Sequence, residues 1–145
     1  MKLIEKKWKP LKLRAIDDND LSVFSDCLYQ SILISSEVQY DIKKKSFSLA
    51  LERFTWEIAD GKDYNLKQVT SILIINGVHK IDTKNIMFNK LIYNVLSISN
   101  VDNNILILLN DKNVINLTVL NWVCLLEDFG KPKWPAVAPS HLRNE

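Results

Sequence analysis

Glycine, proline and cysteine are scarce in this chain of 145 residues, which contains three, four and two of them. Three glycines are too few for the loops that cradle phosphates or dinucleotides, and neither a GxGxxG nor a Walker-type motif is present. Cys27 and Cys124 stand far apart in apolar stretches and form no CxxC pair. We therefore expect buried free thiols in a reducing compartment.

Long apolar runs are also missing. The longest, such as residues 72–75 and 105–109, are far shorter than a membrane-spanning helix, and no apolar region follows the basic start as it would in a signal peptide. The formal net charge of +2 argues against a dedicated DNA-binding domain, which concentrates more positive charge. We expect a cytoplasmic protein without a membrane partner.

What remains is the composition of one ordinary globular domain, with 47% hydrophobic and 25% charged residues. Lysines crowd the first segment, and three of the four prolines lie between residues 132 and 139. We expect a basic N-terminal arm at residues 1–10, a single domain at 11–130 and a Pro-rich, irregular tail at 131–145.

The clearest local pattern predicts a strand followed by a helix. Residues 11–16 alternate between apolar and polar side chains, which is typical of a half-buried strand. One aspartate among Asp17, Asp18 and Asp20 is suited to cap the helix, and the other carboxylates favour its first turn. One apolar face then runs towards Gln30 at spacings of three and four, through Leu21, Phe24, Cys27 and Leu28.

Strands dominate the rest of the chain. Two runs of period-two alternation around the polar turn at residues 43–45 predict a β-hairpin, whose second strand we extend to Trp56. A β-branched, apolar strand at residues 69–78 continues past Gly77 towards Ile81. A meander of three strands follows, at residues 93–98, 105–109 and 114–119.

The last element has two interpretations. Trp122, Leu125, Leu126 and Phe129 share one helical face, and Gly130 would end a helix, so we predict a short helix at residues 121–129. The alternative is a strand that continues from Val114. The fold class is therefore α+β, with a mostly antiparallel curved sheet or partly open barrel, a helix near the N-terminus and a short C-terminal helix.

Three stretches together resemble a known family. They are residues 11–30, the run Arg53-Phe54-Thr55-Trp56-Glu57, and the run Leu126-Glu127-Asp128-Phe129-Gly130 with Trp134 behind it. In this order and spacing they resemble a bacterial family, mainly alphaproteobacterial, known as domain of unknown function 2948. The resemblance runs from about Leu11 to Trp134 and implies a single cytoplasmic domain. It implies no activity, ligand or catalytic residue.

Arg53, Trp56 and Glu57 are the candidate binding residues. On a strand, Arg53 and Glu57 face the same way, and Arg and Trp often dominate binding surfaces, so the three could anchor a protein partner. The alternative is a Trp packed in the core beside an Arg–Glu pair at the end of a strand.

Other candidate sites lack essential parts. Asp17, Asp18 and Asp20 are acidic, but no calcium-loop spacing follows them, so we expect no metal and no cofactor. His79 near Asp82 could do acid–base work, but no nucleophile stands in a catalytic setting. Enzyme activity is therefore disfavoured, although scattered catalytic groups or a small-ligand pocket stay open.

The two ends of the chain combine positive charge with a ring. Lysines flank Trp8 at the start, and two more precede Trp134 at the end. If the termini lie together, one surface could bind RNA or another polyanion. The residues of this candidate site are Lys6, Lys7, Trp8, Lys9, Lys131 and Lys133.

Three hypotheses follow. The leading one is a non-catalytic protein-interaction or adaptor domain that uses Arg53, Trp56 and Glu57. The alternative is an RNA-associated or polyanion-associated accessory protein that uses the basic termini. The third, an enzyme or small-ligand binder, needs a deep pocket that contains polar groups such as His79.

Overall fold

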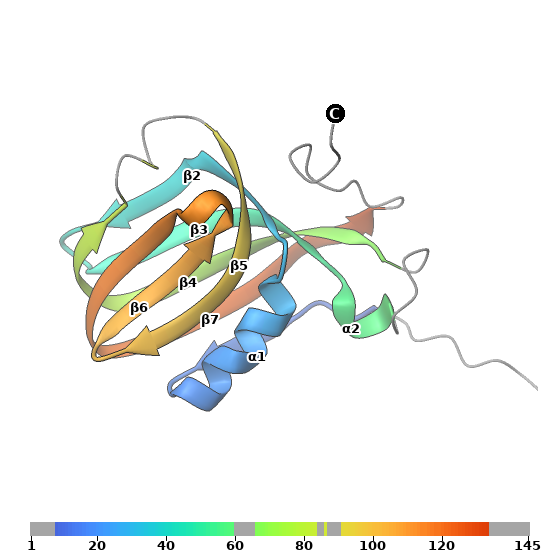
Figure 1. Cartoon of the computed structure of the whole chain (residues 1–145). Helices are drawn as coiled ribbons and strands as arrows, with labels where there is room; N and C mark the ends of the chain where they lie inside the picture. Colours follow the sequence, from blue (N-terminus) through green and yellow to red (C-terminus); the bar gives the residue numbers. More distant parts are fainter. Residues whose placement is uncertain (1–7, 60–65, 84–85, 87–90, 134–145) are drawn as a thin grey trace, which may run out of the picture.

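The computed structural model describes residues 8–59, 66–83, 86 and 91–133. Its elements form an antiparallel sheet with two short helices beside it (Figure 1). The strands are β1 (Lys12–Ala15), β2 (Ile32–Asp41), β3 (Ser46–Phe54), β4 (Gln68–Asp82), β5 (Ile92–Val101), β6 (Asn104–Leu109) and β7 (Val114–Lys133). The two helices are α1 (Asp18–Leu28) and α2 (Trp56–Ala59), and a 3-10 turn, η3 (Asn110–Lys112), lies between β6 and β7.

The sheet closes on itself. Its strand order is β1-β7-β4-β3-β2-β5-β6, and an additional pairing joins β6 back to β7. Six strands thus make a closed barrel, and β1 pairs with the outer part of β7. The sequence predicted a curved sheet or a partly open barrel, and the closure through β6 and β7 corrects that openness.

Strand β7 pairs with two different strands along one of its sides. Its first part pairs with β6 and its second part with β1, while β4 lies along its other side throughout. The change of partner falls near Asn121, which has a φ of 50°. On β4, Gly77 faces this bend with a φ of 87°, and a Cβ placed there would lie 2.5 Å from the Leu120 carbonyl oxygen. Only glycine fits this crossing without displacing the backbone.

Helix α1 forms as its sequence predicts. The Asp20 N–H donates to the Asp17 carboxylate at 2.8 Å, which confirms an aspartate cap and identifies Asp17 as the residue that forms it. Leu21, Phe24 and Leu28 are buried in the core, whereas Cys27 is half-buried. The helix also covers part of β5, because the Ser25 hydroxyl bonds to both the N–H and the carbonyl oxygen of Ile98.

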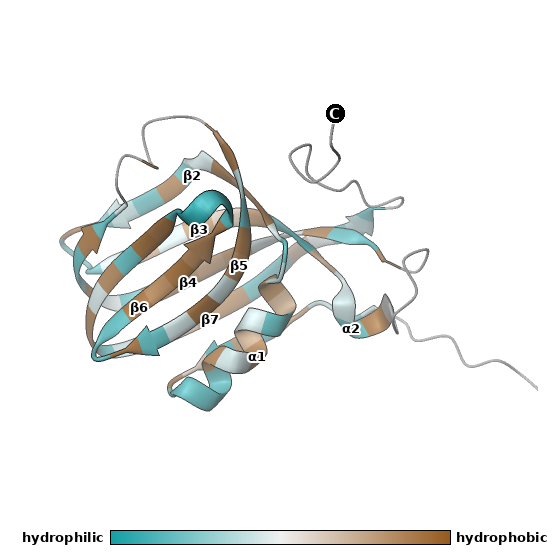
Figure 2. Cartoon of the chain, viewed as in Figure 1, coloured by the Kyte–Doolittle hydropathy of each residue, from teal (hydrophilic) through white to brown (hydrophobic). Residues whose placement is uncertain are grey.

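The strands alternate between the barrel interior and its outer surface, as the sequence indicated. Figure 2 shows this alternation as bands of hydrophobic and hydrophilic colour along the ribbon. The hairpin of β2 and β3, the long β4 and the meander of β5, β6 and β7 are all confirmed. A fully apolar core fills most of the interior, and polar side chains enter it near α2.

Three sequence predictions are wrong. Residues 121–129 are not a helix, because β7 continues as a strand from Val114 to Lys133 and hydrogen-bonds to β4 and β1 on its two sides. The same strand includes residues 131–133, which we assigned to the irregular tail. The second hairpin strand does not reach Trp56, because β3 ends at Phe54 and α2 begins at Trp56.

None of the helices in the described part of the chain has the length and apolar character that crossing a lipid bilayer requires.

Candidate functional site

Arg53 occupies an interior position near the end of β3. It follows Leu49 and Leu51 in the inward-facing phase of the strand, and all three side chains are buried. Arg53 is fully buried, with a relative exposure of 0%. An arginine is rarely buried to this extent unless its charge is paired, so its partners decide what the site can do.

Every N–H group of the Arg53 guanidinium has an acceptor. Its Nε donates to Asp128 Oδ1 and one terminal nitrogen donates to Asp128 Oδ2, both at 2.7 Å. That same terminal nitrogen donates to Glu57 Oε1 at 2.9 Å. The other terminal nitrogen donates to Glu57 Oε2 at 2.9 Å and to the Phe54 carbonyl oxygen at 3.1 Å. A guanidinium has five donors, and all five are used.

Asp128 is saturated in the same way. Besides the two bonds from Arg53, it accepts one from the Ser71 hydroxyl at 2.6 Å and one from the Leu11 N–H at 2.8 Å. Its own N–H donates to the Leu11 carbonyl oxygen at 2.9 Å. A carboxylate offers about four lone-pair sites, and here each has a donor. We call Arg53, Glu57, Ser71 and Asp128 the Arg53 network.

These bonds hold both groups in their charged forms. Burial alone would raise the pKa of Asp128, but the hydrogen bonds from Arg53, Leu11 and Ser71 outweigh it and lower that pKa. Burial alone would likewise lower the pKa of Arg53, but its bonds to Asp128 and Glu57 raise it. The buried pair therefore stays ionised at neutral pH.

The Arg53 network joins five parts of the fold. Arg53 lies on β3, Ser71 on β4, Asp128 on β7 and Glu57 on α2, and Leu11 lies in the chain that enters β1. Because all donors and acceptors around the Arg53–Asp128 pair are used internally, neither side chain has a free bond for a ligand. The arrangement is therefore suited to fastening this end of the barrel.

Glu57 reaches Arg53 through a helical turn. Four residues of extended strand would separate the two by about 13 Å, but α2 turns the chain back and places the pair at 2.9 Å. Our expectation that both residues lie on one strand is thus wrong, although the Arg–Glu pair itself is present. The Glu57 side chain is 32% exposed, so one edge of the network meets solvent.

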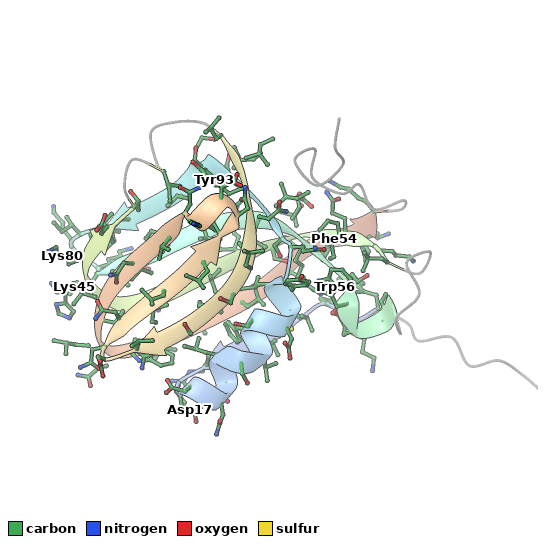
Figure 3. All side chains as sticks on the ribbon, in the orientation of Figure 1. Asp17, Lys45, Phe54, Trp56, Lys80 and Tyr93 are labelled. Atoms are coloured by element: carbon green, nitrogen blue, oxygen red, sulfur yellow. The ribbon has the colours of Figure 1, made fainter. Side chains whose placement is uncertain are left out.

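Trp56 packs at the surface beside this network. Its indole N–H donates to the Tyr29 carbonyl oxygen at 2.7 Å. Its ring lies 6.0 Å from the Tyr29 ring and 5.9 Å from the Phe54 ring. Phe54 is buried, Trp56 is half-buried, and Tyr29 is 46% exposed. Figure 3 shows Phe54 and Trp56 together at the α2 end of the barrel.

The three candidate binding residues thus lie close together but differ in burial and in role. Arg53 cannot be the surface anchor that the sequence suggested, because it is buried and fully bonded. Trp56 and Glu57 do reach the surface, and Tyr29 joins them. We call Tyr29, Trp56 and Glu57 the aromatic corner.

The basic termini are described only in part. Lys6 and Lys7 lie outside the described residues, as do Trp134 and His141. Lys9, Lys131 and Lys133 are exposed, and Trp8 is half-buried with its indole nitrogen enclosed. The two bonds between Leu11 and Asp128 place the start of β1 beside the last part of β7.

The remaining candidates have structural explanations or lie apart. Asp17 and Asp20 accept bonds from backbone N–H groups, and Asp18 accepts one from Asn100, so the acidic cluster serves the start of α1. His79 is exposed on β4. Among the residues that the structure describes, no group of three His, Cys, Asp or Glu side chains is placed to hold a metal ion.

Neither cysteine has an activated thiol. Both are free, and burial raises the pKa of Cys27, against a smaller lowering effect of the Arg53 charge. Burial also raises the pKa of Cys124, to about 12. A thiol becomes a nucleophile through its thiolate, so both are poor nucleophiles at neutral pH.

Sequence reasoning missed Ser71, Asp128 and Tyr29 as site residues. Asp128 has a clear signal, since it follows Cys124 and Leu126 at a spacing of two and so faces inward on a strand. That signal is visible only if residues 121–129 are taken as a strand. Ser71 falls in the same way between the buried Val69 and Leu73.

The fold and the site define a small, closed antiparallel barrel whose α2 end is fastened by a buried Arg–Asp pair. A comparison with protein-family models matches residues 11–141 to the family described as "Protein of unknown function (DUF2948)". The match covers most of the chain, and the chain belongs to this family. No curated protein and no solved structure gives a significant match.

Proposed function

We propose that this chain is a non-catalytic domain that binds another protein through the aromatic corner. One observation carries the proposal: Tyr29 is 46% exposed and paired with the half-buried Trp56, on a framework that the Arg53 network holds in place. Aromatic side chains on a rigid support lose little conformational entropy on binding and often dominate interfaces. We further propose that the domain acts in the cytoplasm without a cofactor.

The chemistry of the described residues favours binding over catalysis. The buried charges of Arg53 and Asp128 are neutralised by each other, and the two thiols have raised pKa values. His79 stands exposed on a strand, away from the polar groups of the Arg53 network. A catalytic site needs a base, acid or nucleophile with free bonding capacity, and these groups do not offer it.

The test is an affinity purification from native lysate with the full chain immobilised, with and without nuclease and at two salt concentrations. The informative variant is Tyr29→Ala, because it removes the exposed ring but keeps the backbone oxygen that Trp56 bonds to. Leu108→Ala on β6 is the matched control, since it also shortens an exposed apolar side chain. We expect protein partners that survive nuclease, are kept by the control and are lost by Tyr29→Ala. Partners retained equally by both variants would refute the aromatic corner.

Polyanion binding through the basic termini is a second candidate function. It is favoured by the contact between Leu11 and Asp128, which brings the N-terminal segment to the part of β7 that carries Lys131 and Lys133. In the same experiment this function predicts partners that are released by nuclease and by high salt. The substitutions Lys9→Glu, Lys131→Glu and Lys133→Glu would then abolish retention.

A further inference from the structure

The end of the barrel opposite α2 carries a group of exposed lysines. Strand β3 ends next to α2, and at its other end it begins at the turn that follows β2. This turn contains Lys43, Lys44 and Lys45, and the neighbouring β4 carries Lys80. We call these four residues the basic end. Figure 3 shows Lys45 and Lys80 on the side of the barrel away from Trp56.

The backbone of the basic end is fixed by hydrogen bonds. The Lys45 carbonyl oxygen accepts from the N–H groups of both Gly77 and Val78, at 3.1 and 2.9 Å, which ties the turn to β4. The Tyr40 hydroxyl adds a bond of 2.7 Å to the Val78 carbonyl oxygen. Lysines on such a turn form a positive surface whose shape exists before any partner binds.

The lysine charges themselves are unpaired. All four side chains are exposed, and in the described part of the chain their ammonium groups make no ion pair. Two carboxylates lie beside them. Asp41 already accepts the N–H groups of Lys43 and Lys44, and Asp82 engages another group. A third carboxylate, Asp102, lies in the neighbouring turn between β5 and β6, so the positive charge is in excess but moderate.

Two exposed apolar side chains accompany the lysines. Ile42, within the turn, is 72% exposed, and Leu120, at the bend of β7, is 55% exposed. Both belong to segments next to Gly77: its N–H donates to the Lys45 carbonyl oxygen, and the Leu120 carbonyl oxygen lies 2.5 Å from the position that a Cβ on Gly77 would occupy. Large aliphatic groups on fixed loops gain free energy if a partner removes them from water.

We propose that the basic end binds the surface of an anionic lipid bilayer. Lysines attract anionic headgroups, and their aliphatic stems lie in the same interfacial region that Ile42 and Leu120 would enter. Such surface binding needs no spanning segment, and our expectation of no membrane partner rested on the shortness of the apolar runs. A nucleic acid would use the lysines but not the aliphatic side chains. The hairpin also offers no free ring for stacking, since Phe47 is buried and Tyr40 is half-buried and bonded.

The test is co-sedimentation of the full chain with vesicles of phosphatidylcholine alone and of phosphatidylcholine mixed with phosphatidylglycerol. We expect binding to the mixed vesicles that weakens with salt, and little binding to phosphatidylcholine alone. Each lysine near an anionic surface contributes a factor of about five to the partition coefficient between vesicle and water. The triple variant Lys43→Gln, Lys44→Gln, Lys45→Gln should therefore lower this coefficient on the order of 100-fold. A triple variant with the same charge change at exposed positions outside every proposed site, Lys12→Gln, Arg14→Gln, Lys112→Gln, is the matched control and should keep binding.

Two single substitutions sharpen the test. Ile42→Ser keeps all lysines and should weaken binding to the mixed vesicles about tenfold, because it removes an apolar group that enters the interface. Asp102→Asn removes a repelled carboxylate and should strengthen binding several-fold; asparagine tolerates the φ of 50° at this position. Thermal unfolding of each variant verifies that it is folded.

Several results would overturn the proposal. They are the absence of binding to mixed vesicles, equal binding to both vesicle types, and equal losses in the two triple variants. A further contrary result is single-stranded RNA that displaces the vesicles while Ile42→Ser has no effect. The basic end would then be a nucleic-acid surface. None of these outcomes bears on the aromatic corner, which lies at the other end of β3 and is tested by protein retention.

Discussion

At the α2 end of the barrel, charged side chains are buried and bonded to one another, whereas at the basic end the lysine side chains are exposed and form no ion pair with other described residues. The Arg53 network uses every donor of its guanidinium and every acceptor site of its aspartate. At the basic end, hydrogen bonds fix the backbone of the turn, and the lysine side chains are exposed to solvent. The difference teaches that the most conspicuous charged motif of this sequence fastens the fold, while an inconspicuous lysine run is available for binding.

The largest effect should come from removing Asp128. We expect Asp128→Ala to destabilise the protein by about 3–5 kcal/mol, because it leaves the Arg53 charge buried beside a single carboxylate and removes the partner of Ser71 and Leu11. Equilibrium urea unfolding measures this loss. Asp102→Asn is the control on an exposed turn, since asparagine tolerates the φ of 50° there, and it should change stability by no more than about 0.5 kcal/mol. Similar losses of stability in the two variants would contradict the difference that we infer between the α2 end and the basic end.

Alanine substitutions at Gly77 and Gly130, two glycines with a positive φ, distinguish the cost of a steric clash from the cost of the backbone conformation. Gly77→Ala should cost about 3 kcal/mol, since the new Cβ would lie 2.5 Å from the Leu120 carbonyl oxygen at a φ of 87°. Gly130→Ala has a similar φ of 75° but no atom within 4 Å of the new Cβ, so it should cost only about 1 kcal/mol. Thermal unfolding of both variants gives the comparison. Equal costs would mean that the crossing of β4 and β7 is not tight.

Acid should weaken the α2 end through Asp128. Its pKa in the folded protein is lower than in the unfolded chain, so its ionised form stabilises the fold. That stabilisation is complete above the pKa of the carboxyl group in the unfolded chain, about 4. It is lost as the pH falls through the lower pKa of the folded protein. Urea unfolding between neutral and acid pH measures the loss. Asp128→Asn cannot titrate and should show a shallower decline below about pH 4, and an unchanged decline would contradict the assignment.

Removal of the Ser71 hydroxyl should have a smaller effect than removal of Asp128. Ser71→Ala removes one hydrogen bond to Asp128 but leaves the ion pair, and we expect a loss of about 1–2 kcal/mol in urea unfolding. Because Ser71 is buried, water does not readily take the place of its hydroxyl as a hydrogen-bond donor to Asp128. A loss as large as that of Asp128→Ala would show that the serine holds more of the structure than its single bond implies.

Much of the fold could be predicted from local patterns. The aspartate cap and the apolar face of α1 follow from short-range chemistry, and both are present, with Asp17 as the capping residue. The period-two runs predicted β3 and the meander, because inward and outward positions alternate on a strand. Residues 121–129 were predicted wrongly because their apolar residues also fit a helical spacing. Pairing with β4 and β1, which are distant in sequence, decides for the strand.

The site could be predicted only in part. The sequence pointed to Arg53, Trp56 and Glu57, but their roles depend on contacts with residues far along the chain. Asp128 lies 75 positions from Arg53, and its inward direction is hidden once its segment is taken as a helix. The turn into α2 was likewise missed, since Phe54 and Trp56 continue an alternating pattern. No local signal indicated that Tyr29 would supply the oxygen for Trp56.

The central claim is that Arg53 and Asp128 serve the fold as a pair. Urea unfolding of Arg53→Met, Asp128→Leu and the double variant tests it most directly, because each single change leaves one buried charge while the double change leaves none in the interior. We predict that the double variant is more stable than either single variant. A double variant whose loss equals the sum of the two single losses would contradict the claim.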